Sequence, residues 1–331
     1  MKKVFIVLFM VFMLFSCNGT EDKKIDDKIE VNKKIQITTS IIPLASIANY
    51  IWWDFVESKA LVPSGVSPHS FDLKPKQIID IEKSDLIVYL NIEHIDWFLD
   101  KAIEWKKNVL AVKEGIKILE SVAHNHEEHS EKEEHHEEHS EKEEHNEENS
   151  EKEEHNEKET HSIDPHIWGN SENASIIANK ILNELIKISP ENKVSFEKNL
   201  KAFKNELDLI KKSFEEEIKG KKQNNFIVFH DAYNYLFNEL NIDISKKHIF
   251  RKNMLNDPNS SQMKELIDEI WELGIKVAFK EPQLDASNLK NLASEYKLEI
   301  FVLNPLGEDY SAKWYIENYK NNLKSLLNIY E

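Results

Sequence analysis

The sequence predicts an α/β protein with two strand–helix lobes, one long linking helix and a disordered His/Glu-rich insertion in the first lobe. Three observations predict this class. Short apolar runs alternate with helical segments in both halves of the chain. An apolar stripe with helical spacing runs through residues 189–222, and a polar repeat interrupts the first half at 124–161. We therefore predict an N-terminal lobe over 35–188, a linking helix over 189–222 and a C-terminal lobe over 223–331.

Residues 1–16 have the pattern of a signal peptide. Two lysines precede an unbroken apolar run of 12 residues, which is shorter than the ~20 residues that span a bilayer. The closing Leu14-Phe15-Ser16-Cys17 resembles the bacterial lipobox, which implies cleavage before Cys17 and lipidation there. Residues 17–34 would then tether a soluble protein to the membrane. The alternative is an ordinary signal with an incidental cysteine.

The first lobe is predicted from short apolar runs and from segments with helical spacing. Its strands are expected at 35–39, 59–63, 86–90 and 109–112, with a further short apolar run at 116–119. Its helices are expected at 43–53, 76–83, 97–106 and 171–188.

The linking helix is predicted from one continuous stripe. Pro190 suits a helix start, because proline at the first position loses no needed donor, and Gly220 suits its end. Between them, apolar residues recur every three or four positions: Phe196, Leu200, Phe203, Leu207, Ile210, Phe214 and Ile218. A helix of about 30 residues would be roughly 45 Å long, enough to run along two lobes. A core helix of one domain is the alternative.

The second lobe repeats the alternation. Its strands are expected at 226–229, 276–280 and 299–303. Its helices are expected at 232–240, 260–273, 286–296 and 313–330.

Charge and composition exclude several classes of function. The formal net charge is −17, and residues 124–161 hold 17 Glu and 4 Lys, a net of −13. A nucleic-acid binder needs a basic face, which this balance does not supply. The chain has only seven glycines and no G-x-G-x-x-G or P-loop string. Its single cysteine excludes an intrachain disulfide and a multi-cysteine zinc cluster.

The block at 124–161 holds nine of the 14 histidines and repeats Ser-Glu-Lys-Glu-Glu-His with a period of ten. It lacks the apolar residues that could offset its ordering entropy, so we expect disorder. Histidine-rich tracts are typical of metal binding; a solvated spacer without function is the alternative. The H-x-x-E-H string at 135–139 is expected by chance in such a composition.

Three of the remaining histidines lie in loops of the α/β pattern. His69 follows a predicted strand, His166 directly precedes a predicted helix, and His230 follows the strand at 226–229. Ligands gather at the carboxyl ends of strands in such sheets, and separate imidazoles can converge on one cation. Asn304, which follows the strand at 299–303, is a fourth candidate. A hydrogen-bonded histidine is the alternative for each. We expect structural roles for the other two, His94 and His248.

Several segments, in order over about residues 35–330, resemble the signatures of the zinc/manganese ABC-transporter substrate-binding lipoproteins (cluster A-I). They are Ser67-Pro68-His69-Ser70-Phe71, Asp164-Pro165-His166-Ile167-Trp168, Phe229-His230-Asp231-Ala232-Tyr233, Phe279-Lys280-Glu281-Pro282-Gln283 and Leu303-Asn304-Pro305-Leu306-Gly307. The resemblance implies two α/β lobes bridged by a long helix, with a metal in the cleft between them. It implies His69, His166 and His230 as metal ligands.

The resemblance also implies which metal is bound. Manganese-type members tend to carry glutamate where this chain has His230, so the chain is similar to the zinc branch, and imidazole suits zinc. Asn304 stands where the family often has aspartate. The fourth position is therefore open between water, the Asn304 oxygen and a nearby carboxylate such as Asp231, Glu281 or Glu308.

The function that follows is a lipid-anchored receptor in the cell envelope, periplasmic or extracytoplasmic. It would capture Zn²⁺ as its transported ligand and deliver it to an ABC permease, without enzymatic activity. A manganese receptor or a metal-dependent surface adhesin of the same family is the alternative. A zinc hydrolase is another, because three histidines and a water also describe a catalytic zinc.

Overall fold

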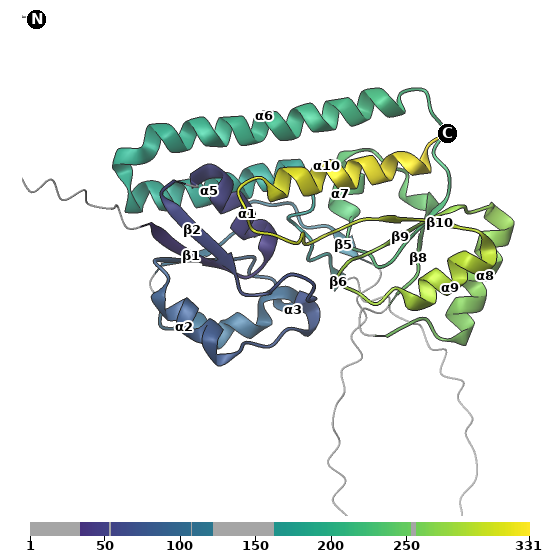
Figure 1. The fold of residues 1–331 in the computed structure, drawn as a ribbon, viewed down its shortest axis with the longest axis horizontal. Coiled ribbons are helices and arrows are strands. Elements are labelled where there is room, and N and C mark those ends of the chain that lie inside the picture. The colour runs from purple at the N-terminus through teal and green to yellow at the C-terminus, as the bar shows by residue number, and fades with distance from the viewer. Residues whose placement is uncertain (1–33, 53, 107, 122–161, 253–255) are drawn as a thin grey trace, which may run out of the picture. The chain divides into compact units, whose positions relative to one another are not determined.

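The structure is a computed structural model that describes residues 34–52, 54–106, 108–121, 162–252 and 256–331. It confirms the predicted class, because two four-stranded parallel sheets form two lobes joined by one long helix (Figure 1). The predicted signal peptide, the lipidation site at Cys17 and the histidine-rich block lie outside the described residues. The lobe boundaries given by the sequence remain predictions.

The first sheet has the order β2-β1-β3-β4, with every neighbouring pair parallel. Its strands are β1 (Ile35–Thr39), β2 (Val56–Ala60), β3 (Leu86–Tyr89) and β4 (Val109–Ala111). Ile87 and Val88 are fully buried, as expected for a parallel sheet covered on both faces. The helices of this part are α1 (Ile42–Trp52), α2 (Pro75–Lys83), α3 (Glu93–Asp96) and α4 (Asp100–Ile103), with short 3₁₀ turns η1 (Pro68–Ser70) and η2 (Trp97–Leu99).

Two short strands flank the histidine-rich segment in the sequence. β5 (Glu120–Ser121) and β6 (Ser162–Ile163) pair antiparallel, with Glu120 opposite Ile163. This pairing brings the residues on either side of the histidine-rich segment together. α5 (Ser171–Ile188) follows, and the side chain of its N-cap Asn170 accepts a hydrogen bond from the backbone N–H of Asn173.

The long helix is α6 (Lys193–Ile218), preceded by the 3₁₀ turn η3 (Pro190–Asn192). Its 26 residues make it about 39 Å long. The predicted stripe is its buried face, and the Phe196 ring stacks on Trp52 of α1 with centroids 3.5 Å apart. Leu209, off the stripe, is 66% exposed. Figure 1 shows α6 running alongside α10, above both sheets.

The second sheet has the order β10-β9-β7-β8 and is also parallel. Its strands are β7 (Phe226–Val228), β8 (Lys247–Ile249), β9 (Val277–Lys280) and β10 (Glu299–Val302). Its helices are α7 (Asn234–Glu239), α8 (Ser260–Leu273), α9 (Ser287–Tyr296) and α10 (Trp314–Leu326), with 3₁₀ turns η4 (Ile244–Lys246) and η5 (Leu327–Ile329). A capping box between Asn259 and Gln262 starts α8, and Gly274 in the left-handed region ends it.

Contacts between α1 and α10 join the two lobes. The Ser46 hydroxyl of α1 donates to the carbonyl of Ser311 at 2.8 Å and accepts from the backbone N–H of Tyr315 at 2.8 Å. Buried residues of both lobes form one continuous apolar cluster, and a second cluster lies between the C-terminal sheet and helices α8 and α9. The lobes are therefore packed together through their helices.

Sequence and structure differ at short elements. The strand expected at 59–63 lies at Val56–Ala60, and the run at 116–119 forms no strand. The helix expected at 97–106 is a 3₁₀ turn followed by one α-helical turn. Strand β8 was missed, because Lys247-His248-Ile249 lacks an apolar run and pairs only at a sheet edge. Over the described residues, none of the helices combines the length and hydrophobicity needed to cross a membrane.

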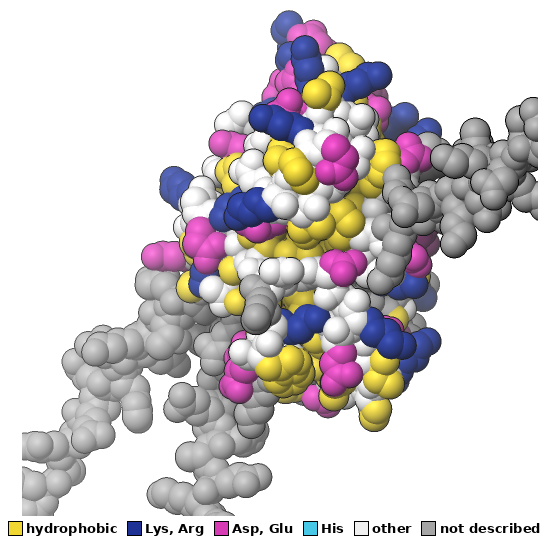
Figure 2. All heavy atoms as spheres, turned by 90° about the vertical axis from the view of Figure 1, so that its left-hand side faces the viewer, with side chains coloured by type: hydrophobic (Ala, Val, Ile, Leu, Met, Phe, Trp, Pro, Cys, Tyr) yellow, Lys and Arg dark blue, Asp and Glu magenta, His cyan; other side chains and the backbone are white. Residues whose placement is uncertain are grey.

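Figure 2 views the end of the molecule that carries the first lobe. Basic and acidic side chains are interspersed over this face, with separate apolar patches between them. No histidine is visible among its coloured residues.

Candidate metal centre

Three loops bring His69, His166 and His230 together. His69 is the middle residue of η1, where Pro68 opens the turn. His166 lies between β6 and α5, and His230 follows the carboxyl end of β7. Each loop comes from a different part of the chain, so the convergence depends on both sheets being in place.

The three imidazoles each offer one nitrogen, and these three atoms lie within 4.8 Å of one another. The ring centroids are 5.5 Å apart for His69–His166, 6.2 Å for His69–His230 and 5.2 Å for His166–His230. The Nε2 atoms of His166 and His230 are 3.4 Å apart. A tetrahedral zinc ion with Zn–N distances of about 2.0–2.1 Å separates two of its nitrogens by roughly 3.4 Å. The geometry therefore fits one small tetrahedral cation.

Buried carboxylates set the orientation of two of these rings. Asp164 Oδ1 lies 2.8 Å from His166 Nδ1, and Glu281 Oε1 contacts His230 Nδ1. Both carboxylates are shielded from solvent, with 0% and 2% of their surface exposed. An ionised carboxylate only accepts, so Nδ1 of each ring is the donor, and in the neutral imidazole Nε2 then presents a lone pair. Two lone pairs that face each other are the arrangement that a shared cation stabilises.

The carboxylates also supply negative charge. Among the described residues, neither Asp164 nor Glu281 forms an ion pair with lysine or arginine. A third buried carboxylate, Asp231, is paired with Lys247. Three imidazoles thus stand beside two buried carboxylates, and two carboxylates in their ionised form match the charge of a divalent cation.

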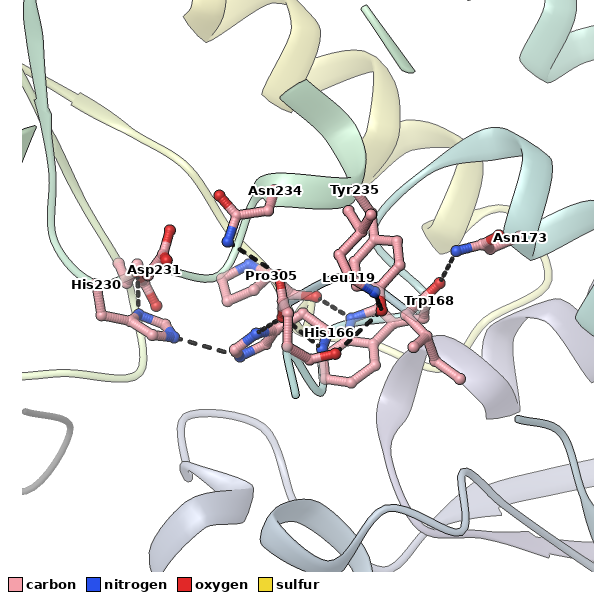
Figure 3. Close-up of polar contacts among 12 residues, drawn as sticks. Leu119, His166, Trp168, Asn173, His230, Asp231, Asn234, Tyr235 and Pro305 are labelled. Carbon is pink, nitrogen blue, oxygen red and sulfur yellow. Dashed lines mark hydrogen bonds and ion pairs between the residues drawn. The ribbon is translucent and has the colours of Figure 1, made fainter. Parts of the chain in front are cut away.

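A polar chain connects the site with the second sheet. Asn234 at the start of α7 donates through Nδ2 to Asp164 Oδ2 at 3.1 Å, and Lys247 of β8 donates to Asn234 Oδ1 at 2.6 Å. Figure 3 shows the rings of His166 and His230 facing each other, with Asn234 above them. The position of the Asp164 carboxylate is therefore fixed by hydrogen bonds to residues of both lobes, His166 and Asn234.

The loop that carries His166 is held by buried side chains. The Tyr235 hydroxyl donates to the carbonyl of Asp164 at 3.1 Å and accepts from the backbone N–H of Leu119 at 3.1 Å. Burial raises the pKa of Tyr235 to about 12, so this hydroxyl stays a donor at neutral pH. Trp168 Nε1 donates to the carbonyl of Pro305 at 2.6 Å, and Asn173 Nδ2 to that of Ile167 at 2.8 Å (Figure 3).

Asn304 organises the loop after β10. Its Oδ1 accepts from Gln283 Nε2 at 2.6 Å and from the backbone N–H groups of Leu306 and Gly307 at 3.1 and 2.8 Å. Gly307 has a φ of +87°, and a Cβ there would lie 2.1 Å from Trp314 Nε1. Glycine is thus required at this position both for its backbone conformation and for the packing of Trp314.

The sequence predicted the three histidines and offered Glu281 only as a possible fourth ligand, and it predicted no role for Asp164, Gln283 or Tyr235. Asp164 belongs to the same short motif as His166, and Glu281 follows strand β9 as His230 follows β7. The sequence held a separate signal for each: Asp164 stands two residues before His166, and Glu281 directly follows the strand predicted at 276–280. Gln283 and Tyr235 carried no such signal. His248 lies in β8, where its Nδ1 is 2.9 Å from Glu269, and the side chain of His94 is outside the described part.

Comparison with known proteins gives a consistent result. The family model "Zinc-uptake complex component A periplasmic" matches residues 37–329. The high-affinity zinc uptake system protein ZnuA of Brucella abortus is 31% identical over 307 residues, covering 88% of this chain and 91% of that protein. The zinc-binding lipoprotein AdcA of Streptococcus pneumoniae serotype 4 is 26% identical over 339 residues, covering 98% of this chain. The chain spans only 60% of the length of AdcA. A crystal structure of ZnuA has the same fold, with a TM-score of 0.70 at 22% identity, covering 90% of this chain and 99% of that one.

Proposed function

The chain belongs to the family of periplasmic zinc-uptake complex A components, and from this premise we propose that it is a receptor that captures Zn²⁺ outside the cytoplasm for an ABC permease. The observation that carries the proposal is the convergence of the nitrogens of His69, His166 and His230 within 4.8 Å. Zn²⁺ is the transported ligand of this site. A permease partner is consistent with the zinc uptake system named for the Brucella relative.

We propose zinc as the cation because the cluster contains nitrogen ligands only. Among the described residues, the convergent group holds three histidines and no carboxylate. Imidazole suits zinc, whereas manganese prefers carboxylate, carbonyl and water ligands. The nearby carboxylates Asp164 and Glu281 are turned to Nδ1 of the rings, where they orient the ligands.

Binding and release, rather than catalysis, is the proposed role. A zinc hydrolase would need a general base free to act on a metal-bound water. The two buried carboxylates nearest the histidines are engaged with imidazole protons. The family of transport receptors, to which the chain belongs, supports the same reading.

A metal titration tests the site. Calorimetry of the mature protein with Zn²⁺ and Mn²⁺ should give one tight zinc site, and replacing His69, His166 and His230 together with alanine should abolish it. His248→Ala, which removes an imidazole elsewhere, is the matched control and should bind zinc like the unmodified protein. A variant without residues 124–161 should keep the tight site and lose weaker binding. Tight binding by the triple variant would disprove the site, and a preference for Mn²⁺ would disprove the specificity.

Delivery and anchoring need separate tests. A strain without this protein should grow poorly under zinc limitation, recover with added zinc, and recover with the unmodified gene but not with the triple-histidine variant. The proposed lipid anchor is tested by Cys17→Ser, which should release the protein from the membrane and abolish incorporation of labelled fatty acid. Continued membrane attachment of this variant would disprove the anchor without affecting the zinc site.

A further inference from the structure

A partly buried glutamine amide lies in the same pocket as the three histidines. Gln283 follows strand β9 and lines this pocket together with His69, His166, His230 and Glu281. Its Nε2 donates to Asn304 Oδ1 at 2.6 Å. That bond fixes which end of the amide is nitrogen, because an oxygen in the same place would face the oxygen of Asn304.

The other end of this amide is an acceptor without a donor. Over the described part of the chain, Gln283 Oε1 is shielded from solvent and makes no hydrogen bond. A buried carbonyl oxygen is costly when no donor reaches it. The lining of the pocket includes donors, such as the Trp168 indole that bonds the carbonyl of Pro305, but none of the described residues donates to this oxygen. The amide oxygen is therefore suited to a donor that comes with the ligand.

Of the protein alternatives for the fourth coordination position, Asp231 is paired with Lys247 and the exposed Glu308 does not line the pocket. Asn304 and Glu281 are engaged within the site. Asn304 Oδ1 accepts three hydrogen bonds, from Gln283, Leu306 and Gly307. Glu281 Oε1 contacts His230 Nδ1. Zinc bound by three histidines commonly takes a water as its fourth ligand, and zinc makes that water a strong hydrogen-bond donor.

We propose that Gln283 is a positioning residue whose Oε1 accepts a hydrogen bond from the water that completes the coordination of zinc. This inference rests on the proposed function, because it assumes a cation on the three histidines. A neutral acceptor holds the water without adding a third anion to Asp164 and Glu281, so the two buried charges still match a divalent ion. Gln283 thereby orients the water, as Asp164 and Glu281 orient the rings of His166 and His230.

The test compares two glutamine-to-methionine substitutions. Gln283→Met keeps the length of the side chain but removes the acceptor. Gln223→Met is the control, because this partly buried amide bonds the backbone of Asp243 in the same lobe and does not line the pocket. Zinc affinity is measured by competition with a chromophoric chelator, and the geometry of the site by the visible spectrum of the Co²⁺ form. Urea unfolding of the metal-free proteins reports stability.

Gln283→Met should lower zinc affinity at least about tenfold, the usual effect of losing an outer partner of a metal ligand, and should change the Co²⁺ spectrum. Gln223→Met should change neither. Unchanged affinity in Gln283→Met, an unchanged spectrum, or equal losses in both variants would overturn the proposal. A zinc-loaded crystal structure of the unmodified protein gives an independent answer. No solvent atom between the ion and Gln283 Oε1 would also overturn it.

These outcomes are separable from failure of the proposed function. If the unmodified protein binds zinc tightly and the triple-histidine variant does not, the site stands whatever Gln283 does. If the triple variant binds zinc as tightly as the unmodified protein, the site itself is wrong, and with it the role of Gln283.

Discussion

Replacing Asp164 with asparagine tests the electrostatic basis of the site. The Asp164 carboxylate accepts at both oxygens: Oδ1 from the backbone N–H of His166 at 2.9 Å and from its Nδ1 at 2.8 Å, and Oδ2 from Asn234 Nδ2 at 3.1 Å. An amide has one acceptor oxygen. If that oxygen faces His166, the amide nitrogen of the variant meets the donating nitrogen of Asn234. If it faces Asn234, both bonds to His166 are lost. Asp164 is fully buried, so water cannot replace either partner.

The magnitude follows from what each substitution removes. Glu281→Gln also takes one negative charge from the site, but glutamine still offers an oxygen to His230 Nδ1. Mutating a residue that orients a metal ligand typically lowers metal affinity about 10–100-fold. We therefore expect a loss of zinc affinity near the lower end of this range for Glu281→Gln and near the upper end for Asp164→Asn. These losses correspond to about 1.4 and about 2.7 kcal/mol of zinc binding free energy.

The assay is competition for zinc with a chromophoric chelator at fixed pH and ionic strength. Asp208→Asn is the charge-matched control, because it removes an exposed carboxylate of α6 that pairs only with Lys212 among the described residues, and it should bind zinc like the unmodified protein. Urea unfolding without metal separates lost affinity from lost stability. Zinc affinities of Asp164→Asn and Glu281→Gln that equal the unmodified value would refute the role assigned to the two carboxylates.

Three further predictions concern stability and are checked by urea unfolding. Gly307→Ala should lower the free energy of unfolding by about 2–5 kcal/mol, because the positive φ and the contact with Trp314 both oppose a Cβ. Gly65, the control, has a similar φ of +77° in open space, so Gly65→Ala should lower it by only about 1 kcal/mol. Equal losses in the two variants would refute the packing argument. Burial raises the pKa of Asp96 to about 6, so the stability that its protonated form contributes is complete below about pH 4 and is lost as the pH rises through 6. The free energy of unfolding of Asp96→Asn should therefore rise by about 3 kcal/mol, relative to that of the unmodified protein, between pH 4 and pH 8. A difference in stability between the two proteins that does not change with pH would contradict this. Phe196→Ala should cost about 3–5 kcal/mol, because the ring is fully buried between α6 and α1, and a loss below 1 kcal/mol would show that α6 is not anchored there.

Periodic segments were predictable because their signal is local. The helices at 171–188 and 260–273 begin and end where the sequence indicated, since spacing and capping residues are read within the segment itself. The buried face of α6 was likewise given by its stripe. Short elements were less predictable. The edge strand β8 contains Lys247 and His248, and only its pairing with β7 makes it a strand.

Part of the candidate site was likewise predictable from the sequence, and part depends on the tertiary structure. The positions of His69, His166 and His230 in loops followed from the pattern of strands and helices. Their distances, and the carboxylates of Asp164 and Glu281 behind two of the rings, depend on how the lobes pack.

The sequence by itself determined the α/β class, the stripe of the linking helix and the residue types able to bind a metal, because these are properties of neighbouring residues. Tertiary structure alone decided which nitrogens face one another, which carboxylate orients which imidazole, and which amide oxygen stays without a donor. Those relations join residues far apart along the chain, such as Asp164 with Asn234 and Gln283 with Asn304. They arise only when distant segments fold against each other, within the second lobe for Gln283 and Asn304 and between the two lobes for Asp164 and Asn234.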